Sequence, residues 1–150
     1  MKNRTIFLAA ALLALIDQLS KNLIEAKLES TTNVFGEFLK LEYSQNTGIA
    51  FGIAIPQTIL IIIIFFMIGF VIYFAHKELN LKSKISQISL ILILGGAFGN
   101  LIDRFTRGYV VDFIAVLKWP NFNLADTYIC IAVLLLIVFY DKIKKVNKIK

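Results

Sequence analysis

The sequence of 150 residues has few charged residues, prolines, cysteines and histidines. Only 17% of its residues are Asp, Glu, Lys or Arg, and it contains two prolines, one cysteine and one histidine. A soluble domain usually carries about 25% charged residues, and a disordered chain is usually rich in charge and proline. One cysteine cannot form an intrachain disulfide, and one histidine cannot build a His-based zinc site. These shortages exclude a soluble globule, a disordered chain and a disulfide-stabilised scaffold.

Hydrophobic residues make up 58% of the chain and are concentrated in four segments. The segments cover residues 5–24, 58–75, 85–104 and 124–140. A membrane-spanning helix needs about 20 apolar residues, and open strands cannot satisfy their backbone in lipid. The composition therefore predicts an all-α membrane fold, with one integral membrane domain over residues 1–150 built as a bundle of four transmembrane helices. The first segment resembles a signal peptide, but a polar stretch rather than a small-residue cleavage site follows it, so we expect an uncleaved first span.

The two loops on the far side of the predicted bundle, residues 25–57 and 105–123, contain short strand-like patterns. Leu39, Leu41 and Tyr43 alternate with polar residues, and Val110 and Val111 are β-branched residues beside an aromatic one. Alternation with a period of two residues is typical of a half-buried strand. We therefore expect a small extracytoplasmic β-element beside the bundle.

The basic residues are distributed unevenly along the chain. Ten of the 16 lie in the N-terminal tail, in the loop at 76–84 or after Tyr140, where Glu78 and Asp141 are the only acids. By the positive-inside rule, this bias predicts that both termini and the 76–84 loop are cytoplasmic. The net charge of +6 is therefore explained by topology, and we expect no nucleic-acid partner.

Polar residues occur at a similar depth in three of the four predicted spans. At ~1.5 Å per residue, Asp17, Asn100 and Asp126 lie about 20 to 24 Å from the cytoplasmic ends of their helices. Lys21 follows Asp17 by four residues, which places the two side chains on one helix face. Ionisable residues inside a span usually face the bundle interior and are candidates for function. A purely structural ion pair is the alternative reading of Asp17 and Lys21.

The remaining polar or small residues allow simpler explanations in most cases. Asp103 and Arg104 can mark the interfacial end of a helix, and the glycine-rich run Gly95–Gly99 is typical of helix packing rather than phosphate binding. Asn123 and Asp126 have the spacing of a helix N-cap. Cys130, which has apolar neighbours, is expected to be a core residue rather than a nucleophile. None of these explanations accounts for Asp112, an acid in an apolar stretch, and carboxylates without metal-ligand partners favour acid–base chemistry with no metal or other cofactor.

Five motifs in chain order resemble those of the bacterial lipoprotein signal peptidases (signal peptidase II). They are Asp17-Gln18-Leu19-Ser20-Lys21, Asn46-Thr47-Gly48-Ile49-Ala50-Phe51, Gly95-Gly96-Ala97-Phe98-Gly99-Asn100-Leu101-Ile102-Asp103-Arg104, Val111-Asp112-Phe113 and Phe122-Asn123-Leu124-Ala125-Asp126. Any one of them is weak evidence. Together they are specific, because they cover residues 17–126 and agree with the layout of four spans.

The resemblance implies an aspartic endopeptidase in the bacterial cytoplasmic (inner) membrane, with its active site toward the extracytoplasmic face. Its substrates would be diacylglyceryl-modified prolipoproteins, cut immediately before the lipidated cysteine. Asp112 and Asp126 match the catalytic pair, and the outer loops match a β-cradle that rests on membrane lipid. The resemblance also implies a monomer inhibited by cyclic peptides of the globomycin type. The residues that match supporting or substrate-binding positions are Asn123, Asn100, Arg104, Asn46, Asp103, Asp17, Lys21 and Gly48.

Two neighbouring carboxyl groups cannot easily ionise together, so the pair is expected to share one proton. The N-terminus of a helix favours the ionised form of Asp126, which would leave the proton on Asp112. We further expect Arg104 to balance the charge of Asp103 or Asp17. The alternative function is a small proton- or ion-coupled transporter, although the internal symmetry and midplane sites usual in transporters are not visible.

Overall fold

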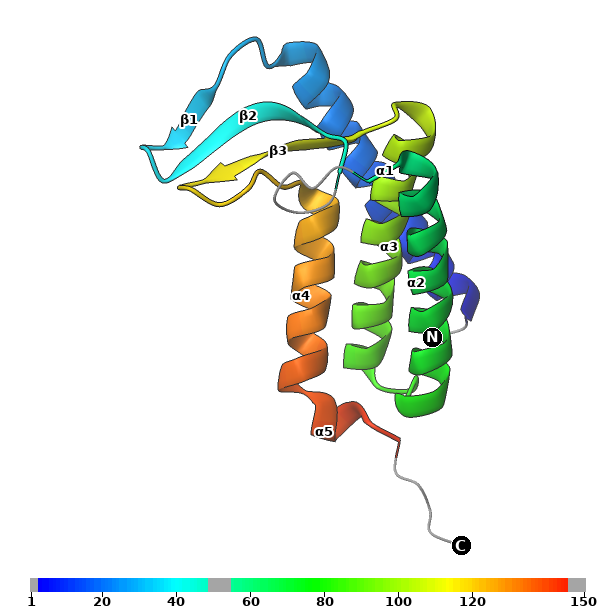
Figure 1. Ribbon diagram of the computed structural model, residues 1–150. Helices are drawn as coiled ribbons and strands as arrows, with labels where there is room; N and C mark the ends of the chain where they lie inside the picture. The colour runs from blue at the N-terminus through cyan, green and yellow to red at the C-terminus, as the bar shows by residue number, and fades with distance from the viewer. Residues whose placement is uncertain (1–2, 49–54, 146–150) are drawn as a thin grey trace, which may run out of the picture.

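The computed structural model describes residues 3–48 and 55–145, which form five helices and three strands (Figure 1). The last three residues of the second motif, Ile49 to Phe51, lie outside the described residues. The elements in chain order are α1 (Asn3–Lys27), β1 (Thr32–Phe35), β2 (Leu39–Asn46), α2 (Gln57–Glu78), α3 (Lys84–Thr106), β3 (Val110–Val116), α4 (Leu124–Val138) and α5 (Tyr140–Ile143).

All four predicted apolar segments are helical. Over the described ranges, α1, α2 and α3 are long and apolar enough to cross a membrane, and α4 is a shorter apolar helix of 15 residues. Helix α4 ends at Val138, two residues before the predicted end of this segment, because the backbone leaves the helical conformation at Phe139. The fold is thus a helical membrane-type bundle with a small sheet at one end (Figure 1).

Helix α3 lies between α1 and α4, and glycines allow the close contact on both sides (Figure 1). A Cβ atom added to Gly95 would lie 2.8 Å from Cβ of Leu13 on α1. One added to Gly96 would lie 2.4 Å from the carbonyl oxygen of Ala125 on α4. Small residues let helix backbones approach closely in membranes, where packing rather than hydrophobic burial drives association. The prediction that the glycine-rich run is a packing face is confirmed.

Helix α2 packs against α3 and exposes most of its apolar side chains. Its buried residues are Leu60 and Ala75, whereas the side chain of Phe66 is 77% exposed. A helix that is apolar all round and largely exposed within the protein is typical of a lipid-facing span.

The three strands form an antiparallel sheet in the order β1-β2-β3. Ser44 of β2 pairs with Asp112 of β3, and Asn46 pairs with Val110. Because side chains two residues apart point to the same face, Asn46 and Asp112 are diagonal neighbours on one face of the sheet. The expected strands are confirmed, but burial does not alternate cleanly in β2, where the register shifts between Leu41 and Ser44.

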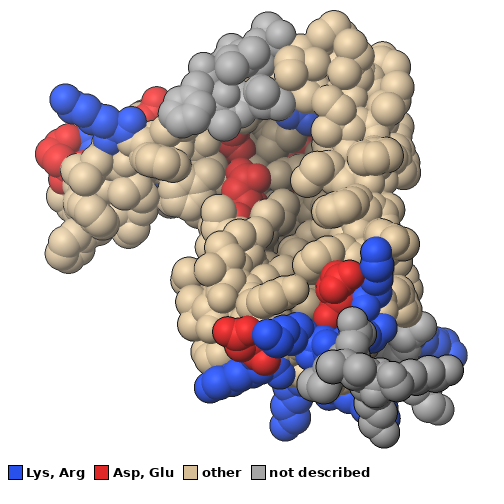
Figure 2. Space-filling view, turned by 60° about the horizontal axis from the view of Figure 1, so that its bottom comes forward, with Lys and Arg blue, Asp and Glu red and all other residues tan. Residues whose placement is uncertain are grey.

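The end of the bundle opposite the sheet holds a buried apolar cluster and both ends of the described chain (Figure 1). The backbone N–H of Asn80, between α2 and α3, donates to the carbonyl of Ile143 in α5 at 2.7 Å. Lys and Arg side chains gather around this end (Figure 2). The members of the cluster are Ile6, Ala10, Ala75, Leu79, Leu90, Leu94 and Ile143.

Replacing Gly96 by alanine should destabilise the bundle, because the new methyl group would collide with the backbone of α4. Overpacking of this kind costs about 1–3 kcal/mol of unfolding free energy. The matched control is Gly69→Ala on α2, where an added Cβ has no heavy atom within 4 Å. We expect thermal unfolding in detergent micelles to show a lower midpoint for Gly96→Ala and an unchanged or higher midpoint for Gly69→Ala. Equal midpoints would contradict the tight contact between α3 and α4.

Candidate active site

The first turn of α4 is built by Asn123 and Asp126, which form a reciprocal capping box. The backbone N–H of Asp126 donates to Oδ1 of Asn123 at 2.9 Å, and the N–H of Asn123 donates to Oδ2 of Asp126 at 3.3 Å. The N–H of Ala125 donates to Oδ1 of Asp17 on α1 at 3.0 Å. These bonds satisfy N–H groups that the helix leaves free, and they fix the carboxylate of Asp126 relative to α1.

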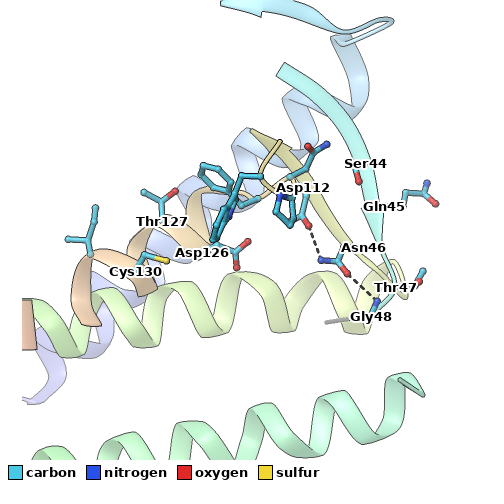
Figure 3. Close-up of a pocket in the computed structure, with 14 residues that line it drawn as sticks. Ser44, Gln45, Asn46, Thr47, Gly48, Asp112, Asp126, Thr127 and Cys130 are labelled. Carbon is cyan, nitrogen blue, oxygen red and sulfur yellow. Dashed lines mark hydrogen bonds between the residues drawn. The ribbon is translucent and has the colours of Figure 1, made fainter. Parts of the chain in front are cut away.

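Asp112 lies on β3, and its carboxylate is held by two asparagines from other segments. Nδ2 of Asn123 donates to Oδ1 of Asp112 at 2.7 Å. Nδ2 of Asn46 donates to Oδ2 at 2.9 Å, a bond that Figure 3 shows. Asp112 is 2% exposed, and this burial raises its pKa to about 6. The hydrogen bond from Asn46 opposes the rise in pKa, the negative charge of Asp126 adds to it, and Asn123 and Lys21 oppose it. Asp112 is therefore an acid that retains its proton closer to neutrality than an ordinary aspartate does.

Two asparagines connect the carboxylates of Asp112 and Asp126. Asn123 binds both acids, and Nδ2 of Asn100 on α3 donates to Oδ1 of Asp126 at 2.8 Å. Nδ2 of Asn123 also lies 3.2 Å from Oδ1 of Asn100. The two acids, which come from a strand and a helix, thus belong to one hydrogen-bond network.

Asp112 and Asp126 line one cavity of about 650 Å³ between the sheet and α4. Cys130 also lines it and is exposed, so the expectation that Cys130 is a core residue is wrong (Figure 3). Acidic side chains are visible inside this hollow in Figure 2, and Figure 3 places Asp112 and Asp126 on its wall. A second cavity of about 370 Å³ lies among α2, α3 and α4 and is lined mainly by apolar side chains. Asn46, Gly48 and Asp126 border both cavities, so Asp126 lies where a partly polar space meets an apolar one.

A buried ion cluster lies beside the two acids. Nζ of Lys21 is 2.7 Å from Oδ2 of Asp17 and 2.9 Å from Oδ2 of Asp103, and all three side chains are fully buried. Nη1 of Arg107 lies 2.6 Å from Oδ1 of Asp103. Lys21 is thus paired with two carboxylates inside the bundle, as a low-dielectric interior requires, and Arg107 at its edge also pairs with Glu25 at 3.3 Å.

The structure brings all ten predicted site residues into one connected network. Asp112, Asp126, Asn123, Asn100 and Asn46 contact one another directly or through a shared partner, and Lys21, Asp17 and Asp103 adjoin them. Arg104 and Gly48 join the network through Asn46. The backbone N–H of Gly48 donates to Oδ1 of Asn46 at 3.1 Å, and Nη2 of Arg104 donates to the carbonyl of Gly48 at 2.6 Å (Figure 3 shows the first of these bonds). The prediction that Arg104 balances Asp103 or Asp17 is wrong, because Lys21 and Arg107 make those ion pairs and α3 turns Arg104 toward Gly48.

Sequence reasoning missed Arg107 and Gln18. Nε2 of Gln18 donates to Oδ1 of Asp103 at 2.8 Å, and Oε1 of Gln18 accepts from Arg107 at 3.2 Å. A signal was present for both, since Arg107 follows Asp103 by four residues and Gln18 lies inside the first motif. Arg107 was not predicted as a site residue because it lies beyond the predicted end of the third span.

Comparisons with known proteins give one consistent result. A family model described as "Signal peptidase (SPase) II" matches residues 9–141. The lipoprotein signal peptidase of Moorella thermoacetica is 42% identical over 133 residues, which cover 87% of this chain and 89% of the relative. That of Halothermothrix orenii is 36% identical over 145 residues, covering 95% and 99%.

Solved structures agree with these sequence relatives. A bacterial membrane enzyme solved at 2.3 Å resolution has a TM-score of 0.80 and 30% identity, and the match covers 94% of this chain and 90% of that one. A second bacterial membrane enzyme, solved at 1.9 Å, has a TM-score of 0.77 at 30% identity, with 93% and 94% covered.

Replacing Asn46 by leucine should raise the pKa of Asp112 above its value of about 6, because the substitution removes a donor that stabilises the ionised carboxylate. Gln45→Leu is the matched control, since the side chain of Gln45 points away from Asp112 (Figure 3). Carbon-13 NMR titration of aspartate-labelled protein in micelles measures the pKa directly. An unchanged or lower pKa in Asn46→Leu would show that this hydrogen bond does not stabilise the charge.

Proposed function

The chain belongs to the signal peptidase II family, and from this membership we propose that Asp112 and Asp126 are its catalytic pair. The family is that of the lipoprotein signal peptidases, so the protein is an aspartic protease of lipoprotein processing. The proposed reaction removes the signal peptide of a diacylglyceryl-modified prolipoprotein immediately before the lipidated cysteine. The alternative of a small ion-coupled transporter receives no support from the relatives.

The observation that carries the assignment is the shared binding of two acids by one asparagine at the wall of a cavity. Asn123 donates its amide to Asp112 and its backbone N–H to Asp126, and both acids line the same space of about 650 Å³. Neighbouring carboxyl groups that face one cavity can hold a single proton between them. Such a pair supplies a general acid and a general base together.

The proposed mechanism assigns the proton to Asp112 and the negative charge to Asp126. The raised pKa of Asp112, about 6, supports this assignment, as does the position of Asp126 in the first turn of α4. Ionised Asp126 takes a proton from a water molecule as that water attacks the scissile carbonyl carbon. Asp112 gives its proton to the carbonyl oxygen, which becomes a hydroxyl of the tetrahedral intermediate. When the C–N bond breaks, the proton held by Asp126 passes to the leaving amine, the hydroxyl returns its proton to Asp112, and a carboxylic acid remains.

The placement in the membrane is part of the same proposal. Four helices cross the cytoplasmic membrane, and the basic end of the bundle faces the cytoplasm by the positive-inside rule. The sheet and both acids then lie toward the extracytoplasmic surface, where the lipidated cysteine of a substrate would be. Phe35 and Trp119, which are 72% and 67% exposed on the sheet side, have the side chains that favour the membrane interface. We further propose that the enzyme acts as a monomer. Cyclic peptides of the globomycin type would compete with the substrate for the cavity of about 650 Å³ that both acids line.

Asp112→Asn and Asp126→Asn should each reduce cleavage of a purified diacylglyceryl-modified precursor by at least about 10³-fold, because amides can neither share the proton nor activate water. Asp141→Asn is the matched control, since Asp141 lies in α5 at the opposite end of the bundle. Wild-type cleavage should also persist after exhaustive chelation, because the proposed chemistry uses two carboxylates and water. Near-normal turnover in either active-site variant would refute the assignment.

The pH dependence should follow the proton on Asp112. Below its pKa of about 6 the carboxyl is protonated and can act as the acid, and above that pH the proton is progressively lost. The value of kcat/KM, which reports the free enzyme, should therefore fall with rising pH through an alkaline limb. Asn46→Leu should move that limb to higher pH. A limb that stays in place, or moves to lower pH, would exclude Asp112 as the proton donor.

A further inference from the structure

Lys21 is the most deeply buried cation among the described residues, with a side chain that is 0% exposed. An isolated charge inside an apolar bundle is costly unless it is paired and hydrogen-bonded. Its Nζ contacts three oxygens, at 2.7 Å in Asp17, 2.9 Å in Asp103 and 2.9 Å in Asn100. The first two contacts neutralise its charge, whereas the third is to a neutral amide that leads to the catalytic pair.

The contact with Asn100 determines which way the amide of Asn100 faces. An ammonium group has three donors and no acceptor, so only the oxygen of the amide can face Lys21. The amide nitrogen must then face the opposite way, where Nδ2 donates to Oδ1 of Asp126 at 2.8 Å. Nδ2 of Asn123 reinforces this orientation by donating to the same oxygen of Asn100 at 3.2 Å.

We propose that Lys21 is a positioning residue that acts through Asn100 to keep Asp126 a hydrogen-bond acceptor. The inference rests on the proposed function, in which ionised Asp126 activates the water. If the amide of Asn100 were reversed, its oxygen would face the carboxylate of Asp126, which would favour a proton on that carboxyl group and remove the base. Lys21 itself does not line either cavity that borders the acids.

Other charged groups surround Asp126 but do not replace this link. Asp17 on α1 is negative, Asp112 on β3 carries the proton in the proposed mechanism, and Arg104 on α3 donates to the carbonyl of Gly48. Asp103 on α3 is already bound by Lys21 and Arg107. Among the charged groups of the described residues, Lys21 is the one that donates to the amide bound to Asp126.

A double-mutant cycle in the full-length enzyme separates positioning from a structural role. The cycle compares Lys21→Met, Asn100→Leu and the double variant for cleavage of a diacylglyceryl-modified precursor. Each single variant should lower kcat on the order of 10- to 100-fold and leave KM nearly unchanged, because neither Lys21 nor Asn100 lines the cavity of about 650 Å³ that both acids line. The double variant should be no slower than the slower single variant, since both changes interrupt the same link.

Arg107→Met provides the matched control for loss of a cation from the cluster. Arg107 binds Asp103, Gln18, Glu25 and Asn22, and no hydrogen bond joins it to Asn100 among the described residues. The Arg107→Met substitution should lower the midpoint of thermal unfolding while leaving kcat per folded enzyme unchanged. Because Lys21→Met leaves two buried carboxylates, the members of the cycle that lack Lys21 are also measured with Asp17→Asn, which lowers the uncompensated charge while its Oδ1 still accepts from Ala125.

The kinetic results of the cycle and of the Arg107→Met control distinguish a positioning role of Lys21 from a purely structural one. Multiplicative losses in the double variant, or an equal loss of kcat in Arg107→Met, would reduce Lys21 to a structural residue. Failure of the catalytic assignment would appear separately, as retained turnover in Asp112→Asn or Asp126→Asn.

Discussion

A polar side chain inside an apolar helix bundle has to find its partners within the protein, because hydrocarbon supplies neither donors nor acceptors. In this molecule that requirement joins the helices to one another. Lys21 of α1 binds Asp103 of α3, and Asp17 of α1 accepts from the backbone of α4 at Ala125. The contacts that satisfy these buried groups are therefore the same contacts that fix α1, α3 and α4 at the level of the acids.

The acid pair depends on two kinds of structure that meet at this level. Asp126 is placed by a helix start, where capping bonds define the position of the carboxylate within the first turn. Asp112 is placed by the register of a sheet, in which its strand pairs with the strand that carries Asn46. Asn123 bonds to Asp112 through its side chain and to Asp126 through its backbone N–H, so a single residue links the sheet to the bundle.

How well the sequence predicted the site depended on how regular the intervening structure is. Helical rise converts residue number into depth, and for this reason Asn100 and Asp126 were expected at one level and are bonded at 2.8 Å. No such rule relates a strand to a helix bundle, so the place of Asp112 came only from the family motifs. The partner of Arg104 was missed because it depends on the rotation of α3 and on the path of the chain at Gly48. Arg107, the C-cap of α3, was missed because apolar composition ends before the helix does.

The shortness of α4 has a consequence for the lipid around it. Its 15 residues span about 22 Å, roughly 8 Å less than a typical hydrocarbon core. When a helix is shorter than the hydrocarbon core, the bilayer can become thinner beside it. Because Asp126 is in the first turn of α4, this local depression of the membrane surface would lie at the acid itself. A peptide bond could then meet water below the surrounding membrane surface without leaving the membrane.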